Sequence, residues 1–141
     1  MRILLDTNIF LDVLLDRPGV ADESEQALNR FHEAPALYGW ISWHTLSNLY
    51  YIGERFAGRA KALDEIDRIL NVFQVAAVET KDALAARRLP MKDFEDALQS
   101  ASALAAKVDN LLTRNIRDFR YSPVPAISPR QFLKVSENRG S

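Results

Sequence analysis

The sequence contains no cysteine and only two histidines, His32 and His44. The lack of cysteine excludes a disulfide scaffold, a thiolate metal site, an iron–sulfur cluster and a cysteine nucleophile. Two histidines without cysteine are too few for a zinc site built from the usual nitrogen and sulfur ligands. Any metal bound by this chain would therefore be held by oxygen ligands.

Long apolar runs and a strong charge of either sign are also lacking. No run approaches the ~20 apolar residues that span a bilayer, and the start of the chain has no signal-peptide pattern, so we expect a cytoplasmic protein. The formal net charge is −1, from 18 basic and 19 acidic residues, and exerts no general attraction on nucleic acid. A nucleic-acid partner has to be argued from local clusters of basic residues.

The chain of 141 residues is long enough for one domain with a single core. Hydrophobic residues make up 48% and charged residues 26%, which are the proportions of an ordinary globular protein that folds alone. We expect a single domain over residues 1–135, followed by a disordered tail over residues 136–141.

Strand-like and helical patterns alternate along the whole chain. The expected strands are residues 3–5, 37–41, 72–78, 110–113 and 124–127. The expected helices are residues 9–15, 22–33, 43–52, 63–70, 81–86, 93–105 and 129–133, with Ser42 and Thr80 as predicted N-caps. This alternation is typical of right-handed crossover units, so the predicted fold class is α/β with a parallel sheet of four to five strands.

Carboxylates lie where strands of this sheet end. Asp6 closes the first strand, Asp118 follows the fourth, and Asp96 lies in the first turn of the helix before the fourth. Ligands of open parallel sheets bind outside the carboxyl ends of the strands, so we expect three carboxylates to meet at one rim. They repel one another unless a divalent cation neutralises them, and Mg²⁺ or Mn²⁺ fits oxygen ligands best. The chemistry implied is phosphodiester hydrolysis.

Each of these carboxylates also has a purely structural explanation. Asp6 after a strand is an ordinary turn or helix-cap residue. Asp93 and Asp96 at a helix start interact favourably with the helix dipole whether or not they bind a ligand, and we expect Asp93 to do only that. Asp118 has the alternative role of pairing with a neighbouring arginine.

Taken together, these segments resemble the PIN domain family and its VapC-like toxin ribonucleases. The resemblance covers residues 3–12, 41–49, 93–103, 111–119 and 124–133. It implies a three-layer α/β/α sandwich around a parallel sheet and an endoribonuclease that depends on Mg²⁺ or Mn²⁺. It also implies frequent homodimerisation and, in many small members, the toxin role in a toxin–antitoxin pair.

The resemblance assigns roles to single residues. It makes Asp6, Asp96 and Asp118 the acidic metal ligands and catalytic residues. Asn8 and Thr113 correspond to supporting polar residues near the metal.

Asn48 departs from the common family pattern, which has a glutamate there, and resembles a subset of PIN-like proteins with asparagine. An amide oxygen can ligate a metal or bind its water, but it carries no charge and cannot act as a general base. Asn115 is a further supporting residue where many relatives carry aspartate, and we take Asp118 as the charged member. Glu95 points about 100° away from its ligand neighbour, so we expect it to face elsewhere. His44, one turn before Asn48, is expected to be a surface histidine.

Basic residues flank the proposed acids. Arg114 and Arg117 lie beside Asp118, while Arg88 and Lys92 precede the helix of Asp96. We expect these four basic side chains to bind RNA phosphates around the acidic centre. The alternative is that they are ordinary solvated side chains.

The leading hypothesis is a metal-dependent endoribonuclease of VapC-like type, with RNA as substrate, a homodimeric state and a separately encoded antitoxin as partner. The alternative is a catalytically weakened PIN-like module that binds RNA or a protein without cleavage, and Asn48 motivates it. A phosphatase with Asp6 as nucleophile is disfavoured, because such enzymes use a second aspartate two residues later, where this chain has Asn8.

Overall fold

The computed structural model describes residues 1–137, and residues 138–141 lie outside the described part. The strands are β1 (Arg2–Leu5), β2 (Tyr38–Ile41), β3 (Phe73–Val75), β4 (Asn110–Leu112) and β5 (Ala126–Ile127). The helices are α1 (Thr7–Leu14), α2 (Ala21–Glu33), α3 (Trp43–Ala57), α4 (Arg59–Val72), α5 (Thr80–Arg88), α6 (Phe94–Ala105), the 3₁₀ helix η1 (Ile116–Phe119) and α7 (Pro129–Glu137). The prediction of the α/β class is confirmed.

The five strands form one parallel sheet in the order β3-β2-β1-β4-β5. The chain first adds β2 and β3 on one side of β1, and then returns to add β4 and β5 on the other side. The strand order therefore reverses between β1 and β4. In open parallel sheets the crevice outside the carboxyl ends of such a strand pair is where ligands bind.

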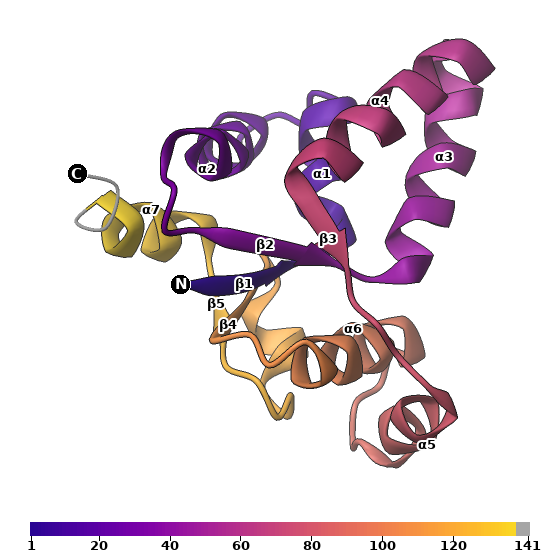
Figure 1. The fold of residues 1–141 in the computed structure, drawn as a ribbon, viewed down its shortest axis with the longest axis vertical. Coiled ribbons are helices and arrows are strands. Elements are labelled where there is room, and N and C mark those ends of the chain that lie inside the picture. The colour runs from indigo at the N-terminus through magenta and orange to yellow at the C-terminus, as the bar shows by residue number, and fades with distance from the viewer. Residues whose placement is uncertain (138–141) are drawn as a thin grey trace.

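Helices cover both faces of the sheet, as Figure 1 shows, with α1 to α4 on one face and α5 and α6 on the other. Ile3 and Leu5 of β1 belong to the core that includes residues of α1 to α4, while Leu4 belongs to the core that includes α6. A strand covered on both faces has to be apolar throughout, which explains the unbroken run in β1. The predicted three-layer sandwich is confirmed. No helix of the described chain is both long and apolar enough to cross a membrane.

Helix α7 closes the domain against α2. Phe132 of α7 is fully buried and stacks on Phe31 of α2, with 5.4 Å between the ring centroids. Ser136 is also buried, and the helix continues through Glu137. The expected disordered tail is therefore wrong at positions 136 and 137, and its remainder lies outside the described residues. The single domain over residues 1–135 stays a prediction.

Three local predictions differ from the structure. The third strand is shorter than expected, because residue 72 still belongs to α4. Glu79, not Thr80, is the N-cap of α5, and its backbone N–H donates to Asp82 Oδ2 at 2.8 Å in a capping box. Ser42 holds the N-cap position of α3, but its hydroxyl donates to Gln99 Oε1 at 2.5 Å rather than bonding to that helix.

Candidate active site

Asp6 lies at the carboxyl end of β1, where the sheet order reverses. Its side chain is only 3% exposed, and Thr113 Oγ1, just after β4, donates to Asp6 Oδ2 at 2.9 Å. The backbone N–H of Asn115 in turn donates to Thr113 Oγ1 at 3.0 Å. Burial raises the pKa of Asp6, and the Thr113 hydroxyl together with the backbone N–H groups of Thr7 and Asn8 opposes this rise. The ends of β1 and β4 thus hold one carboxylate in a defined orientation.

Asp96 stands in the first turn of α6, where Asp93 is the N-cap and accepts a hydrogen bond from the Asp96 backbone N–H at 3.1 Å. Burial raises the pKa of Asp96 to about 7, and the charges of Asp93, Asp6, Asp118 and Glu95 contribute to the rise. Carboxylates from β1, α6 and η1 therefore lie within electrostatic reach of one another.

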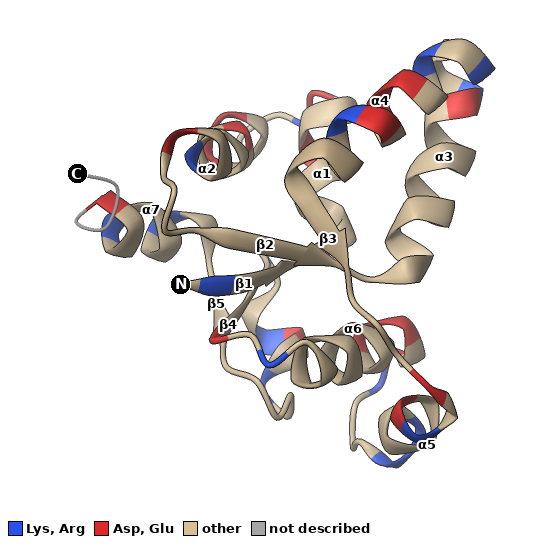
Figure 2. Cartoon of the chain, in the orientation of Figure 1, with Lys and Arg blue, Asp and Glu red and all other residues tan. Residues whose placement is uncertain are grey.

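A cleft of about 580 Å³ opens between the start of α6 and η1. Both acidic and basic side chains line it, and they include Lys92, Asp96, Arg117, Asp118, Arg120 and Tyr121. Figure 2 shows acidic residues at the start of α6 and basic residues in the segment that joins α5 to α6. This arrangement surrounds an acidic centre with positive charge, as the binding of a phosphate backbone requires.

The acidic side chains do not converge on a single point. Within residues 1–137, no three aspartate, glutamate or histidine side chains come close enough together to hold one metal ion. Asp6 is turned onto Thr113, and Asp118 lies on the exposed helix η1. The carboxylates also repel one another when no cation lies between them, which opposes their convergence. The fold brings Asp6, Asp96 and Asp118 to one end of the sheet without closing them around one position.

Asn48 and Glu95 connect helix α3 to helix α6 at the same end of the sheet. Asn48 Nδ2 donates to Glu95 Oε1 at 2.7 Å, and His44 Nε2 lies 3.9 Å from the same oxygen. Glu95 is exposed and turned toward α3, and it is not among the residues that line the cleft with Asp96. The charge of Glu95 also raises the pKa of Asp6 and of Asp96. His44, expected at the surface, is half-buried beside this contact.

A family model described as PIN domain matches residues 2–117. The chain belongs to the PIN domain family. This membership confirms the resemblance that the sequence motifs indicated. Comparison with curated protein sequences gave no significant match.

Solved structures share the fold of this PIN domain at low sequence identity. The structure of VapBC2 from Rickettsia felis bound to a promoter DNA fragment has a TM-score of 0.70. It shares 20% identity over 91% of this chain and 98% of that chain. A toxin–antitoxin complex from Klebsiella pneumoniae has a TM-score of 0.66 and 23% identity over 90% and 97%. VapC20 from Mycobacterium tuberculosis, described as a Sarcin-Ricin loop cleaving toxin, has a TM-score of 0.60 and 18% identity over 77% and 86%.

Arg114 of this PIN domain has a structural partner. Its Nε and Nη2 donate to the two carboxylate oxygens of Asp12 at 2.6 and 2.9 Å. Asp12 is fully buried and also accepts hydrogen bonds from Arg17 and from Ser24. The ion pair anchors the segment after β4 to α1, and RNA binding by Arg114 stays a prediction.

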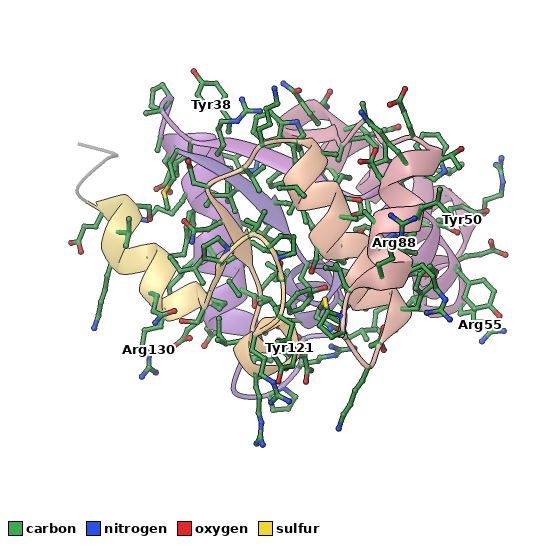
Figure 3. All side chains as sticks on the ribbon, turned by 90° about the horizontal axis from the view of Figure 1, so that it is seen from below. Tyr38, Tyr50, Arg55, Arg88, Tyr121 and Arg130 are labelled. Atoms are coloured by element: carbon green, nitrogen blue, oxygen red, sulfur yellow. The ribbon has the colours of Figure 1, made fainter. Side chains whose placement is uncertain are left out.

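The other three predicted RNA-binding residues occupy different places. Lys92 and Arg117 line the cleft beside Asp96. Arg88 is exposed at the end of α5 and is not among the residues that line the cleft. Figure 3 shows Arg88 on helix α5, well separated from the cleft residue Tyr121. Only two of the four basic residues are therefore at the acidic centre without a buried partner.

Gln99 is a buried polar residue beneath the site that was not predicted from the sequence. Its Nε2 donates to Thr7 Oγ1 at 2.9 Å and to Thr45 Oγ1 at 3.2 Å, and its Oε1 accepts from Ser42. The available signal was a glutamine three residues after Asp96, in a helix whose neighbouring positions are alanine, serine and leucine. The network joins α6 to the starts of α1 and α3.

Proposed function

We propose that this PIN domain is an endoribonuclease that depends on Mg²⁺ or Mn²⁺ and acts as the toxin of a VapBC-like toxin–antitoxin pair. The observation that carries the proposal is that Asp96 and Asp118 line one cleft together with Lys92 and Arg117. The raised pKa of Asp96, caused by burial and by neighbouring carboxylates that include Asp6 and Asp118, agrees with like charges held close together and with their mutual repulsion. A divalent cation would relieve this repulsion, so the site is suited to bind one.

The donor set fits a hard divalent cation. It consists of carboxylate oxygens, and Mg²⁺ keeps several waters while binding to proteins through only one or two carboxylates. Three converging side chains are therefore not required. Asp6 and Asp96 would hold the ion directly, and Asp118 would bind one of its waters. The bound ion would supply an activated water and neutralise charge that develops on the phosphate.

The remaining residues of the chain would orient the reactants. Thr113 fixes the Asp6 carboxylate through its hydroxyl. Lys92 and Arg117 line the cleft, from which they would bind backbone phosphates on either side of the cleaved bond. The pair of Arg114 with Asp12 holds the segment that carries Asp118 in place.

The comparisons support the proposal of an antitoxin partner. VapC20 is described as a toxin that cleaves the Sarcin-Ricin loop, and two other similar structures are toxin–antitoxin complexes. By extension we assign to this chain an RNA substrate, an antitoxin protein and a homodimeric state. Its place of action would be the cytoplasm, where structured RNA is abundant.

Single carboxylate-to-amide variants test the proposal. The wild type should cleave RNA with Mg²⁺ or Mn²⁺ but not with EDTA, while Asp6→Asn and Asp96→Asn should each lose at least about 100-fold in cleavage rate, because each removes a ligand charge. Asp67→Asn, at an exposed position of α4, is the matched control and should cleave as the wild type does. Cleavage is measured on a labelled structured RNA, and circular dichroism checks the fold.

Two results would contradict the proposal. Wild-type cleavage rates in both site variants would show that these carboxylates take no part in the reaction. RNA binding with no cleavage in either metal would favour the non-cleaving binding module, which Asn48 motivates.

A further inference from the structure

Tyr121 is an aromatic residue of the acidic cleft to which the proposed function gives no role. It lines the cleft together with Asp96 and Asp118, and it is 53% exposed. A single exposed aromatic residue is common on protein surfaces. The support of this ring and the charges around it make Tyr121 informative.

Two buried residues anchor the turn that carries Tyr121. Phe119 before it and Val124 after it both belong to the core on the α6 side of the sheet. Between these anchors, the backbone N–H of Ser122 donates to the Phe119 carbonyl at 2.9 Å, and the N–H of Val124 donates to Ser122 Oγ at 3.2 Å. The backbone at position 121 is therefore already ordered, so a ligand would not have to order it on binding.

Arg120 supports the ring itself. Its guanidinium carbon lies 4.9 Å from the centroid of the Tyr121 ring, within the range of a cation–π contact. Arg120 also lines the cleft, as do Lys92 and Arg117, so the ring stands among three basic side chains. Unpaired nucleotides are bound by this combination, in which a base stacks on an aromatic ring and basic side chains contact the phosphates.

We propose that Tyr121 is an RNA-binding residue on whose ring an unpaired base next to the cleaved bond stacks. The inference rests on the proposed function and deepens it, because it names the kind of nucleotide that the cleft recognises. The faces of a base inside a duplex are covered by the neighbouring base pairs, so this ring selects unpaired nucleotides. Lys92 and Arg117 would bind the adjoining phosphates.

The test measures RNA binding to the full chain in EDTA, so that binding is read without cleavage. A short labelled single-stranded RNA is the probe, and fluorescence anisotropy gives its Kd. Tyr121→Ala should weaken binding by at least about fivefold, because it removes one base–aromatic stack. Tyr121→Phe keeps the ring and should bind as the wild type does.

Two controls separate stacking from a general loss of affinity. Tyr38 is also 53% exposed but lies at the start of β2, well separated from Tyr121 in Figure 3, and Tyr38→Ala should leave binding unchanged. An RNA duplex of the same length is the second probe. Tyr121→Ala should bind it as the wild type does, whereas Arg117→Gln should weaken the binding of both probes, because both contain phosphates.

The outcomes distinguish this inference from the proposed function. Equal binding of the single strand by Tyr121→Ala and the wild type would overturn the inference and favour a protein contact for the ring. Equal weakening of both probes by Tyr121→Ala would overturn it as well, because a duplex offers no base to stack. A wild type that binds the single strand but cleaves it with neither Mg²⁺ nor Mn²⁺ would instead overturn the proposed function.

Discussion

Asp96 is the residue whose charge depends most on its surroundings. Its pKa of about 7, against an ordinary value of 3.8, means that half of the carboxyl groups are protonated near neutral pH when no cation is bound. The causes are burial and four neighbouring acidic residues, and not a strained backbone. In the proposed function, a divalent cation would relieve the repulsion between these carboxylates.

This repulsion makes the stability of the metal-free protein depend on pH. Between about pH 4 and pH 7 the folded chain holds the Asp96 proton more tightly than the unfolded chain, so the free energy of unfolding should fall as pH rises through this window. The carboxyl group is half-exposed, and solvent screening reduces the expected loss to about 1 kcal/mol. Urea unfolding of the wild type and Asp96→Asn in EDTA, at pH 4.5 and 7.5, measures it.

The variant Asp96→Asn is the reference for the wild type, because it removes the titration of Asp96 and keeps every other titrating group. It should lack this part of the pH dependence and gain stability relative to the wild type at the higher pH. Two curves that stay parallel over the whole pH range would contradict the assignment of the raised pKa to Asp96.

At the scale of elements, helix α6 is positioned by a buried polar network. Gln99 lies one turn after Asp96 on α6, and its side-chain amide binds Thr7 of α1 and both Ser42 and Thr45 of α3. Because all of these groups are buried, each hydrogen bond matters more than it would at the surface. The middle of α6 is thereby tied to the starts of α1 and α3.

Replacing Gln99 with leucine should destabilise the protein by about 2 kcal/mol, because three buried hydroxyl groups lose a hydrogen-bond partner while the volume is nearly kept. For a chain of this length, the melting temperature should fall by about 6 °C. Calorimetry or circular dichroism measures the shift. Gln26→Leu, at an exposed position of α2, makes the same chemical change without a buried network and should shift the melting temperature by less than about 2 °C. Equal shifts in the two variants would contradict the role of the network.

At the scale of the whole molecule, α3 presents the largest exposed aromatic side chains. Trp43 is 73% exposed and Phe56 64%, and Tyr51 lies between them on the same helix. Exposed large apolar side chains are candidates for a contact with another protein. We use the proposed homodimer to test whether Phe56 belongs to such a contact.

Light scattering after size exclusion should therefore give the wild type a mass of twice 16.0 kDa. Phe56→Glu places a charge in the expected interface and should weaken dimerisation by at least about tenfold, so that monomer is seen at the same concentration. Leu84→Glu on α5 makes a similar change at another exposed apolar residue and should stay dimeric. A monomeric wild type would contradict the homodimer.

Prediction from the sequence succeeded where one element carries its own pattern. The apolar run of β1 predicted a strand buried on both faces, and α7 was predicted from Ser128-Pro129 and Phe132. For Glu95 a helical wheel gives the angle to Asp96 but not the partner on that side, which is Asn48 of α3. Ser42 holds the predicted N-cap position of α3, but its hydroxyl donates to Gln99 of α6, a partner that the local sequence does not reveal.

The order of the strands and of the α-helices, the parallel sheet and the acidic residues next to strand ends could all be predicted from the sequence. Apolar periodicity and turn residues are local properties, and they act within a few positions of the chain. Only the tertiary structure decided which polar groups bind each other: Glu95 with Asn48, Arg114 with Asp12, and Gln99 with three hydroxyls. The physical reason is that polar groups are satisfied by whatever partner packing brings near, and these partners lie up to 102 positions away.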